Sequence, residues 1–509
     1  MSETQASRFN HAGPGEPSSS ALSQPSPLRP ILSILANPVR AVIQGLGRLL
    51  ATLGMIDGVR ADRIAELAWP RIVTGLARMS KATADVAMVG MALGPSAIAG
   101  VGYGVPYWTM TFMIGGGLAG GTISLVSQRF GAKRREKIGV AVKVSALLSL
   151  LATLPLVVLF WSVPEPLIRL IGTGEDAIQF GTRYLQVASL AMPFSALNLI
   201  ASRALIGADD ARTPMIVRAG GAAANIAVNA VLIFVFDLGV VGAALGTVLG
   251  SIGGTLLFTW GLVSGRLPLL GGLPLRVDES SPHWDAADAR HLIRISTPLA
   301  LRKIAQSGGQ FPMLAIVGLL GPTVVAAYVV ALRVRALMNT PGWGFGLASS
   351  SLVGQSLGRG NVEEADAYAR DTLRFTVIAY TVVGVGVFVG ASSVSHLFVS
   401  NPETLRATTA LIRATCVSVI LWGIMNGGMG PLRASGDTRW PFYGQILGLF
   451  GFALPAAYIG ATTGLGVWGL YIAMVVETGV PAAIIYYRYR SDAWKRIGHS
   501  YRSAALGTT

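Results

Sequence analysis

Charged residues are scarce in this chain. They make up 13% of its 509 residues, whereas hydrophobic residues make up 52%. A soluble protein needs more charge than this to cover its surface, so the lipid bilayer is the expected solvent. Crossing the hydrocarbon takes about 20 apolar residues per helix, and the chain holds about a dozen such stretches. The composition therefore predicts an all-α integral membrane protein with many spans.

The sequence also has few of the residues and motifs that catalysis uses. Its single cysteine, Cys416, cannot form an internal disulfide, and with five histidines it leaves little from which to build a zinc site. No G-x-x-x-x-G-K-[ST] phosphate loop occurs, which argues against direct coupling to ATP. Residues 354–358 match the G-x-S-x-G pattern of serine hydrolases, but that chemistry needs a strand–turn–helix context. Because this stretch ends an apolar span, we predict a protein without enzymatic activity or cofactors and keep an intramembrane hydrolase as a remote alternative.

The formal net charge of +15 raises the question of nucleic-acid binding. Most basic residues, however, gather in short loops between apolar spans, as in 129–137, 203–212, 433–439 and 488–490. This is the pattern of cytoplasmic loops in membrane proteins. We therefore predict no nucleic-acid partner, a multi-pass location in the cell membrane and both termini in the cytoplasm.

Apolar stretches predict twelve spans. The glycine-rich stretch 117–121 within the second span predicts a close contact between helices, because small residues let backbones approach. The predicted spans are 68–93, 97–126, 140–161, 185–205, 215–236, 241–263, 297–320, 323–352, 375–392, 407–429, 442–459 and 467–487.

The second six spans repeat the first six. Gly94-Pro95 recurs as Gly321-Pro322 and Gln128 recurs as Gln355, in both cases 227 positions later (321 − 94 and 355 − 128). A constant offset across separate motifs indicates an internal duplication. Because six is an even number, the second copy enters the membrane in the same orientation as the first. Parallel repeats of this kind form two lobes related by an axis along the membrane normal, with the substrate site between them.

These features predict six segments along the chain. They are a disordered tail (1–30), an amphipathic segment at the membrane surface (31–63), an N-lobe of six spans (64–263), a cytoplasmic linker (264–290), a C-lobe of six spans (291–490) and a C-terminal tail (491–509).

Nine short motifs follow one another along the chain. They are 67–70 (LAWP), 85–90 (DVAMVG), 94–99 (GPSAIA), 125–128 (LVSQ), 203–207 (RALIG), 212–214 (RTP), 225–229 (NIAVN), 352–355 (LVGQ) and 436–439 (GDTR). In their order and spacing these motifs resemble the multidrug and toxic compound extrusion (MATE) family. The similarity covers nearly everything but the tails.

The resemblance implies two six-helix lobes in a V shape that alternate between outward-facing and inward-facing states. It also implies export of organic, often cationic, drug-like molecules in exchange for inward Na⁺ or H⁺. We expect such a protein to work as a monomer in the lipid bilayer.

Asp85 is the leading candidate for chemistry. A carboxylate inside a membrane span is costly, so such residues usually face a cavity and carry ions or protons. Arg78, Lys81 and Asp85 lie at i, i+3 and i+7, on one stripe of a helix, which makes both basic residues candidate charge partners. In the family, an Asp at this position of the first helix takes part in cation coupling. The alternative is a Lys81–Asp85 pair that only stabilises helix packing. A tight pair would also make Asp85 a poor proton acceptor unless Lys81 moves.

Three polar residues elsewhere in the first half extend this candidate site. In one branch of the family, an Asn and an Asp spaced by four on the fifth helix and a Thr on the sixth join the first-helix Asp. The matching positions here are Asn225, Asn229 and Thr247, so the second acid is absent. Together with Asp85 they could offer oxygen ligands to Na⁺. The two asparagines could equally serve only as hydrogen-bonding contacts between helices.

Two further intramembrane residues have open interpretations. Pro70 in the first span could bend this helix during transport, a role that the resemblance implies, or could be a static kink or a helix-start proline. Glu477, the only acid well inside a second-half span, could pair with an arginine such as Arg413 in a structural role.

Two alternative functions to drug export remain. A flippase for lipid-linked sugars has the same two-lobe architecture, and its cavity should carry cations for a pyrophosphate. Arg78, Lys81, Arg302 and Lys303 keep this alternative open. A channel is the remaining alternative.

Overall fold

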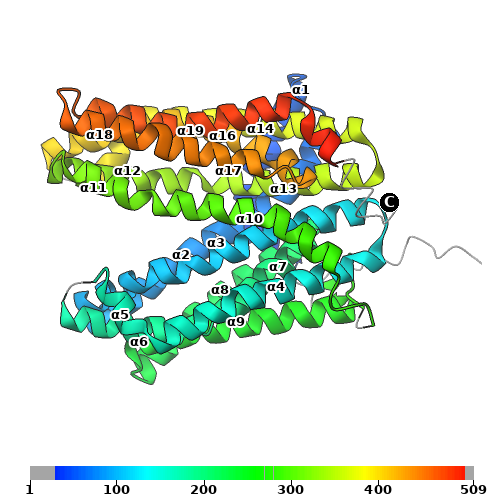
Figure 1. The fold of residues 1–509 in the computed structure, drawn as a ribbon, viewed down its shortest axis with the longest axis horizontal. Helices are drawn as coiled ribbons and strands as arrows, with labels where there is room; N and C mark the ends of the chain where they lie inside the picture. Colours follow the sequence, from blue (N-terminus) through cyan, green and yellow to red (C-terminus); the bar gives the residue numbers. More distant parts are fainter. Residues whose placement is uncertain (1–28, 173, 269, 279, 400, 499–509) are drawn as a thin grey trace, which may run out of the picture.

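The computed structural model describes residues 29–172, 174–268, 270–278, 280–399 and 401–498. Within these residues the fold is helical apart from one two-stranded ribbon of two-residue strands. The predicted tail 1–30 lies outside the described residues except for its last two positions, and the predicted tail 491–509 is described only as far as residue 498. Figure 1 shows two helical lobes that meet at one end and diverge at the other, which gives the predicted V shape.

The N-lobe carries the first repeat. Its elements are α2 (Gly58–Leu93), α3 (Pro95–Gly131), α4 (Arg135–Ser162), α5 (Pro164–Arg169), α6 (Glu175–Ser189), α7 (Met192–Gly207), α8 (Arg212–Ala230), the π-helical turn η2 (Val231–Val235) and α9 (Gly239–Ser264).

The C-lobe carries the second repeat, after a ribbon of β1 (Arg266–Leu267) and β2 (Gly271–Gly272) in the linker. Its elements are α10 (Ala286–Gly308), α11 (Gln310–Gly318), α12 (Pro322–Met338), α13 (Thr340–Arg359), α14 (Val362–Val389), α15 (Ala391–His396), α16 (Pro402–Ser435), α17 (Arg439–Ile446), η3 (Leu447–Ala453), α18 (Leu454–Thr462) and α19 (Val467–Arg490).

Within the described residues, nine helices are long and apolar enough to cross a membrane, and the pair α6 and α7, bent by 49°, makes a tenth. The two remaining predicted spans, α2 and α10 with α11, carry charges in their middles and are therefore less apolar. These charges include Lys81 and Asp85 in α2 and Arg302 and Lys303 in α10. With these two spans included, the described part of the chain accounts for the twelve predicted.

The repeated Gly-Pro motif begins equivalent helices in the two lobes. Gly94 has a φ of +80° and Gly321 a φ of +96°, a region that glycine adopts without a steric penalty. Pro95 and Pro322 then occupy the first positions of α3 and α12, where the missing N–H is not needed. The motif is a turn that ends one span and starts the next.

The first span begins earlier than predicted. Helix α2 starts at Gly58, ten residues before the predicted start at position 68, and Asp57 caps it by accepting a hydrogen bond from the Arg60 N–H at 2.9 Å. In the preceding helix α1 (Arg29–Thr52), Ile43 and Leu50 are buried. Its neighbours are α2 and α14, so this buried side packs against both lobes.

The glycines of α3 do form the predicted contact, and this contact joins the lobes. A Cβ on Gly117 would lie 2.7 Å from the Cβ of Ala300 and 2.9 Å from the Ser296 carbonyl oxygen of α10. The pseudo-equivalent Gly344 of α13 approaches α2 in the same way, with a Cβ position 2.6 Å from the Ala68 carbonyl oxygen. The two lobes therefore touch through matched pairs of helices, α3 with α10 and α13 with α2.

At the end where the lobes converge, the repeated glutamines close the interface symmetrically. Gln128 of α3 donates to the Ala434 carbonyl oxygen at 2.6 Å, and Gln355 of α13 donates to the Gly207 carbonyl oxygen at 3.4 Å. Each bond crosses from one lobe to the other, and the two acceptors are themselves 227 positions apart (434 − 207). The internal repeat thus places matching contacts on both sides of the interface.

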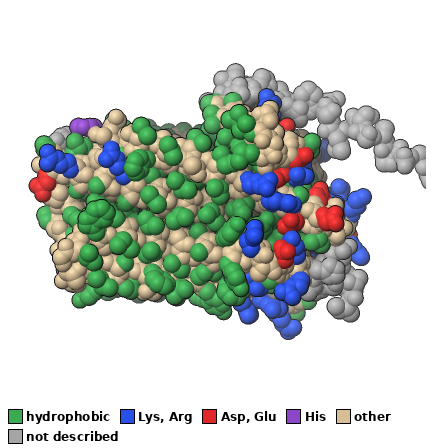
Figure 2. All heavy atoms as spheres, turned by 90° about the horizontal axis from the view of Figure 1, so that it is seen from above, with side chains coloured by type: hydrophobic (Ala, Val, Ile, Leu, Met, Phe, Trp, Pro, Cys, Tyr) green, Lys and Arg blue, Asp and Glu red, His purple; other side chains and the backbone are tan. Residues whose placement is uncertain are grey.

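Two ion pairs reinforce this closed end. Arg60 of α2 lies 2.6 Å from Asp371 of α14, and Arg129 of α3 makes a two-pronged pair with Asp288 of α10. Both pairs link the N-lobe to the C-lobe. Figure 2 shows that Lys and Arg side chains, with Asp and Glu among them, gather at one end of the molecule, next to a broad hydrophobic surface.

Candidate cation-coupling site

The site begins with a lysine and a carboxylate on one stripe of α2. The Nζ atom of Lys81 lies 2.5 Å from Oδ2 of Asp85, one helical turn away, as the sequence spacing allowed. Both side chains are largely shielded, with 22% and 18% of their surfaces exposed. A charge pair this well shielded interacts more strongly than one in water.

The fifth span supplies the other contacts of the carboxylate. The Nδ2 atom of Asn229 donates to Oδ1 of Asp85 at 2.8 Å and to Oδ1 of Asn225 at 3.1 Å. Asn225 in turn donates to the Gly246 carbonyl oxygen of α9 at 2.6 Å. The two asparagines are buried and link three helices, α2, α8 and α9. They therefore make the helix contacts of the structural interpretation and also reach Asp85.

Thr247 on the sixth span completes the group. Its hydroxyl accepts a hydrogen bond from Nζ of Lys81 at 3.3 Å and lies 3.2 Å from the Ala243 carbonyl oxygen, to which it donates. The ammonium of Lys81 thus bridges Asp85 on α2 and Thr247 on α9. All four residues predicted for cation coupling lie in one network, and Lys81 is its positive centre.

The network leaves one buried acceptor without a partner. Among the described residues nothing hydrogen-bonds to Oδ1 of Asn229, although this atom is buried. An unpaired buried polar atom is costly, and in this setting it favours a bound donor or cation. Asp85, Asn229 and Thr247 provide the hard oxygens that Na⁺ accepts, but the ammonium of Lys81 lies among them. A metal ion would fit here only after Lys81 moves.

Gly246 makes room for this arrangement. A Cβ at this position would lie 1.6 Å from Oδ1 of Asn229, so any side chain would displace the amide. We expect Gly246→Ala to reduce coupled transport about tenfold, because the displaced Asn229 no longer orients Asp85. Gly253→Ala on the same helix, where a Cβ would meet nothing within 4 Å, should have no effect. Initial rates of transport in proteoliposomes check this prediction, and equal rates for the two variants would contradict it.

Three expectations, two about charged residues and one about a proline, need correction or refinement. Arg78 does not pair with Asp85; its guanidinium stacks on the ring of Trp343 from the C-lobe, 5.1 Å from the centroid. Glu477 pairs with Arg335 at 2.7 Å and not with Arg413, because Arg335 on α12 faces α19 inside the C-lobe. Pro70 is the thirteenth residue of α2, which excludes the interpretation as a helix-start proline.

The structure brings together more positive charge than the sequence analysis singled out. We call this group the cationic cluster; it consists of Arg71, Arg78, Arg203, Arg218, Arg302, Lys303 and Arg433. Two of its members, Arg71 and Arg78, are two helical turns apart on α2, and this spacing was the available signal. The other members come from α7, α8, α10 and α16, so only the tertiary structure brings them together.

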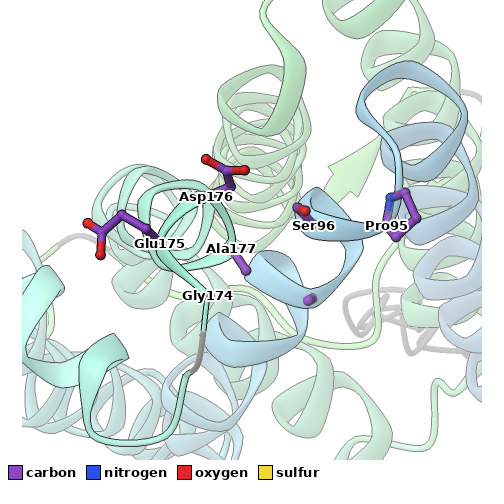
Figure 3. Close-up of a pocket in the computed structure, with 7 residues that line it drawn as sticks. Pro95, Ser96, Gly174, Glu175, Asp176 and Ala177 are labelled. Atoms are coloured by element: carbon purple, nitrogen blue, oxygen red, sulfur yellow. The ribbon is translucent and has the colours of Figure 1, made fainter.

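A surface pocket also occurs away from this region. It has a volume of about 320 Å³ and lies between the first turn of α3 and the first turn of α6. Figure 3 shows Pro95 and Ser96 on one side of it, with Glu175 and Asp176 on the other and their carboxylates directed away from it. None of the residues that line it belongs to the network around Asp85.

Two pseudo-symmetric membrane lobes with a charged network inside one of them define a membrane transporter. The MatE family model matches the chain twice, at residues 70–231 and 298–459, which together cover more than half of it. The chain belongs to this family, the multidrug and toxic compound extrusion (MATE) transporters, and is not an enzyme.

Named relatives and a solved structure are similar over most of the chain. The chain is 28% identical to the probable multidrug resistance protein NorM of Bradyrhizobium diazoefficiens over 464 residues, which cover 86% of this chain and 95% of the relative. It is 26% identical over 416 residues to the probable multidrug resistance protein YoeA of Bacillus subtilis, covering 80% and 88%. A MATE crystal structure in the bent conformation superimposes with a TM-score of 0.79 at 22% identity, covering 86% of this chain and 97% of that one.

Proposed function

We propose that the protein is a secondary multidrug exporter in which Asp85, Lys81, Asn229 and Thr247 couple transport to an inward flow of H⁺ or Na⁺. The observation that carries this proposal is the network in the N-lobe, where a shielded carboxylate holds an ammonium against a second helix. Its curated relatives are named as probable multidrug resistance proteins, which supports the direction of transport and the breadth of substrates.

A proton arriving at Asp85 would act through Lys81. A neutral carboxyl no longer attracts the ammonium, so the bridge from α2 to α9 loses its main electrostatic contribution. Helix α2 is then free to change its course at Pro70, where the helix lacks one backbone hydrogen bond. Because α2 also contacts α13 of the C-lobe, a change in its course reaches the interface between the lobes.

Sodium would act on the same atoms by a different route. Na⁺ carries the same charge as the ammonium and could replace it between Asp85 and Thr247, with Asn229 as a further oxygen ligand. The resident ammonium makes H⁺ the simpler coupling ion, because protonation of Asp85 needs no competition for the space. The positive-inside rule favours a cytoplasmic location for the basic loops at the closed end of the V, and this orientation would make the structure an outward-facing state.

Gradients imposed separately on proteoliposomes test the proposal. Vesicles are loaded with ethidium or with carboxyfluorescein, and efflux is followed after an inward H⁺ gradient or an inward Na⁺ gradient is applied. Acceleration of either dye by one of the gradients supports coupled export and names the ion. If neither gradient changes the efflux of either dye, the proposal is overturned. A conductive leak in the absence of gradient-driven efflux would identify a channel.

Lys81 provides a second test that separates coupling from packing. We expect Lys81→Ala to change the pH dependence of transport, because the ammonium no longer lies 2.5 Å from the carboxylate that would take up the proton. Lys81→Arg keeps the charge and should keep the profile close to that of the unmodified protein. A Lys81→Ala profile identical to that of the unmodified protein would leave the pair with a packing role only.

A further inference from the structure

Three members of the cationic cluster lie close to one aromatic ring between the lobes. The charged groups of Arg78, Lys303 and Arg71 lie 5.1, 5.6 and 5.7 Å from the centroid of Trp343. Trp343 belongs to α13 and Lys303 to α10 of the C-lobe, whereas both arginines belong to α2 of the N-lobe. Cations from both lobes therefore lie close to a single indole ring.

Within the described parts of the chain, the seven cations lack negative partners. Among the described residues, none of them has a carboxylate within ion-pairing distance, although fifteen ion pairs occur elsewhere in that part of the chain. Arg71 and Arg302 are 9% and 8% exposed, and the Nε atom of each is buried without a hydrogen-bond partner in the described structure. The Nη2 atom of Arg302 donates to the sulfur of Met425 at 3.4 Å.

The members of the cluster also act on one another. The positive charge of Arg78 interacts electrostatically with four other members: Arg71, Arg203, Arg218 and Lys303. Like charges in a shielded region repel, and an incoming cation would add to this repulsion. An anion would relieve it and would supply acceptors to the unpaired guanidinium groups.

We propose that the substrate is an organic anion, with a carboxylate or phosphate group held by Arg302, Lys303 and Arg78 and a flat apolar part against Trp343. The ring of Phe112, 5.8 Å from the guanidinium of Arg78, extends the apolar surface on the N-lobe side. This inference rests on the proposed function and names its substrate class. It reverses the expectation of cationic substrates that came from the family resemblance.

Two sources of such an anion share this chemistry. One is a water-soluble aromatic or amphipathic acid, and the other is the headgroup of a lipid-linked pyrophosphate. Arginine forks bind carboxylates and phosphates alike, so the cluster suits both. The length and the apolar character of the remainder of the molecule distinguish them.

The charge of the substrate also determines how much net charge each transport cycle moves across the membrane. Exchange of one monovalent cation for one proton moves no net charge. Export of one monovalent anion against one inward proton moves two positive equivalents inward, so a membrane potential negative inside drives it. Efflux of carboxyfluorescein should therefore accelerate when a potassium diffusion potential, negative inside, is imposed with valinomycin.

Equilibrium binding tests the inference independently of transport. Purified protein in a neutral detergent is titrated against carboxyfluorescein and ethidium, two flat fluorescent ring systems of opposite charge, and binding is read by anisotropy. We expect carboxyfluorescein to bind more tightly, and Arg302→Gln to weaken its binding about tenfold, as loss of one charge-assisted contact implies. Arg302→Lys should retain most of the affinity. Arg413→Gln removes an equal charge from an exposed site on α16, stacked on Phe388, and should change nothing.

The outcomes separate this inference from the proposed function. Tighter binding of ethidium, or equal effects of Arg302→Gln and Arg413→Gln, would overturn the anionic substrate, even if gradients drive ethidium export. Selective anion binding without any response to gradients would overturn coupled export and leave the substrate class standing. If Arg302→Gln does not fold, Lys303→Gln takes its place in the same comparison. The source of the anion is identified by displacing the bound dye with a polyprenyl pyrophosphate and, separately, with inorganic pyrophosphate. If the polyprenyl pyrophosphate displaces the dye at a far lower concentration, the lipid-linked source is identified. If the two displace it at equal concentrations, a soluble anion is identified.

Discussion

Asp85→Asn should reduce gradient-driven export to the level of protein-free liposomes while the protein still reaches the membrane. The amide keeps the shape of the side chain and can still accept the hydrogen bond from Asn229. It cannot take up a proton and offers no negative charge to the ammonium of Lys81, so the charge change that we propose for the coupling step is lost. Export that continues with an unchanged response to the gradient would remove Asp85 from the coupling site.

Glu477→Gln is the matched control for this variant. Glu477 is also a shielded acid inside a span, with 13% of its side chain exposed, and it pairs with Arg335 within the C-lobe. Each substitution leaves a cation without its partner, which costs about 3 kcal/mol or more in a buried pair. Both variants should therefore unfold more readily on heating, but only Asp85→Asn should lose the response to the gradient. Equal loss of coupling in both would mean that stability, and not ion binding, explains the defect.

Gly117→Ala should shift the protein away from the state in which the two lobes meet at their basic end. The added methyl group would overlap both Ala300 and the backbone of Ser296, and a backbone cannot yield as a flexible side chain does. Overpacking of this kind costs about 2 kcal/mol, which corresponds to a change of about thirtyfold in the balance between two states. Gly116→Ala adds the same methyl group where nothing lies within 4 Å and serves as the control.

Distances between spin labels on the two lobes measure this shift. Arg135→Cys and Glu363→Cys place labels on exposed residues at the starts of α4 and α14, and Cys416→Ala removes the native thiol. We expect a longer distance to dominate in Gly117→Ala and the shorter one in Gly116→Ala. Gly344→Ala, at the pseudo-equivalent contact with Ala68, should act in the same direction. Identical distance distributions in all variants would show that these glycines do not control closure.

The contacts between the helices show how much of the structure can be predicted from local sequence. Gln128 and Gln355 were found as a repeat, and their place in equivalent helices followed from the common offset. That each of them donates to the opposite lobe, and that the acceptors repeat with the same offset, depends on how the lobes are packed. In the same way, the spacing of Lys81 and Asp85 predicted a pair on one helix face, whereas the contact of Lys81 with Thr247 needed the position of α9.

The membrane environment, the duplicated set of spans, the carboxylate with its lysine, and the glycine face of α3 could all be predicted from the sequence. These properties follow from composition and from spacing along one helix, which are local. The packing of the helices was needed to show that Arg78 stacks on Trp343, that Glu477 pairs with Arg335, and that cations from both lobes lie close to the ring of Trp343. Residues far apart in the chain become neighbours only when helices pack, and the energy of a buried charge depends on all of its neighbours. For this reason the sign of the charge on the proposed substrate was inferred from the structure and not from the sequence.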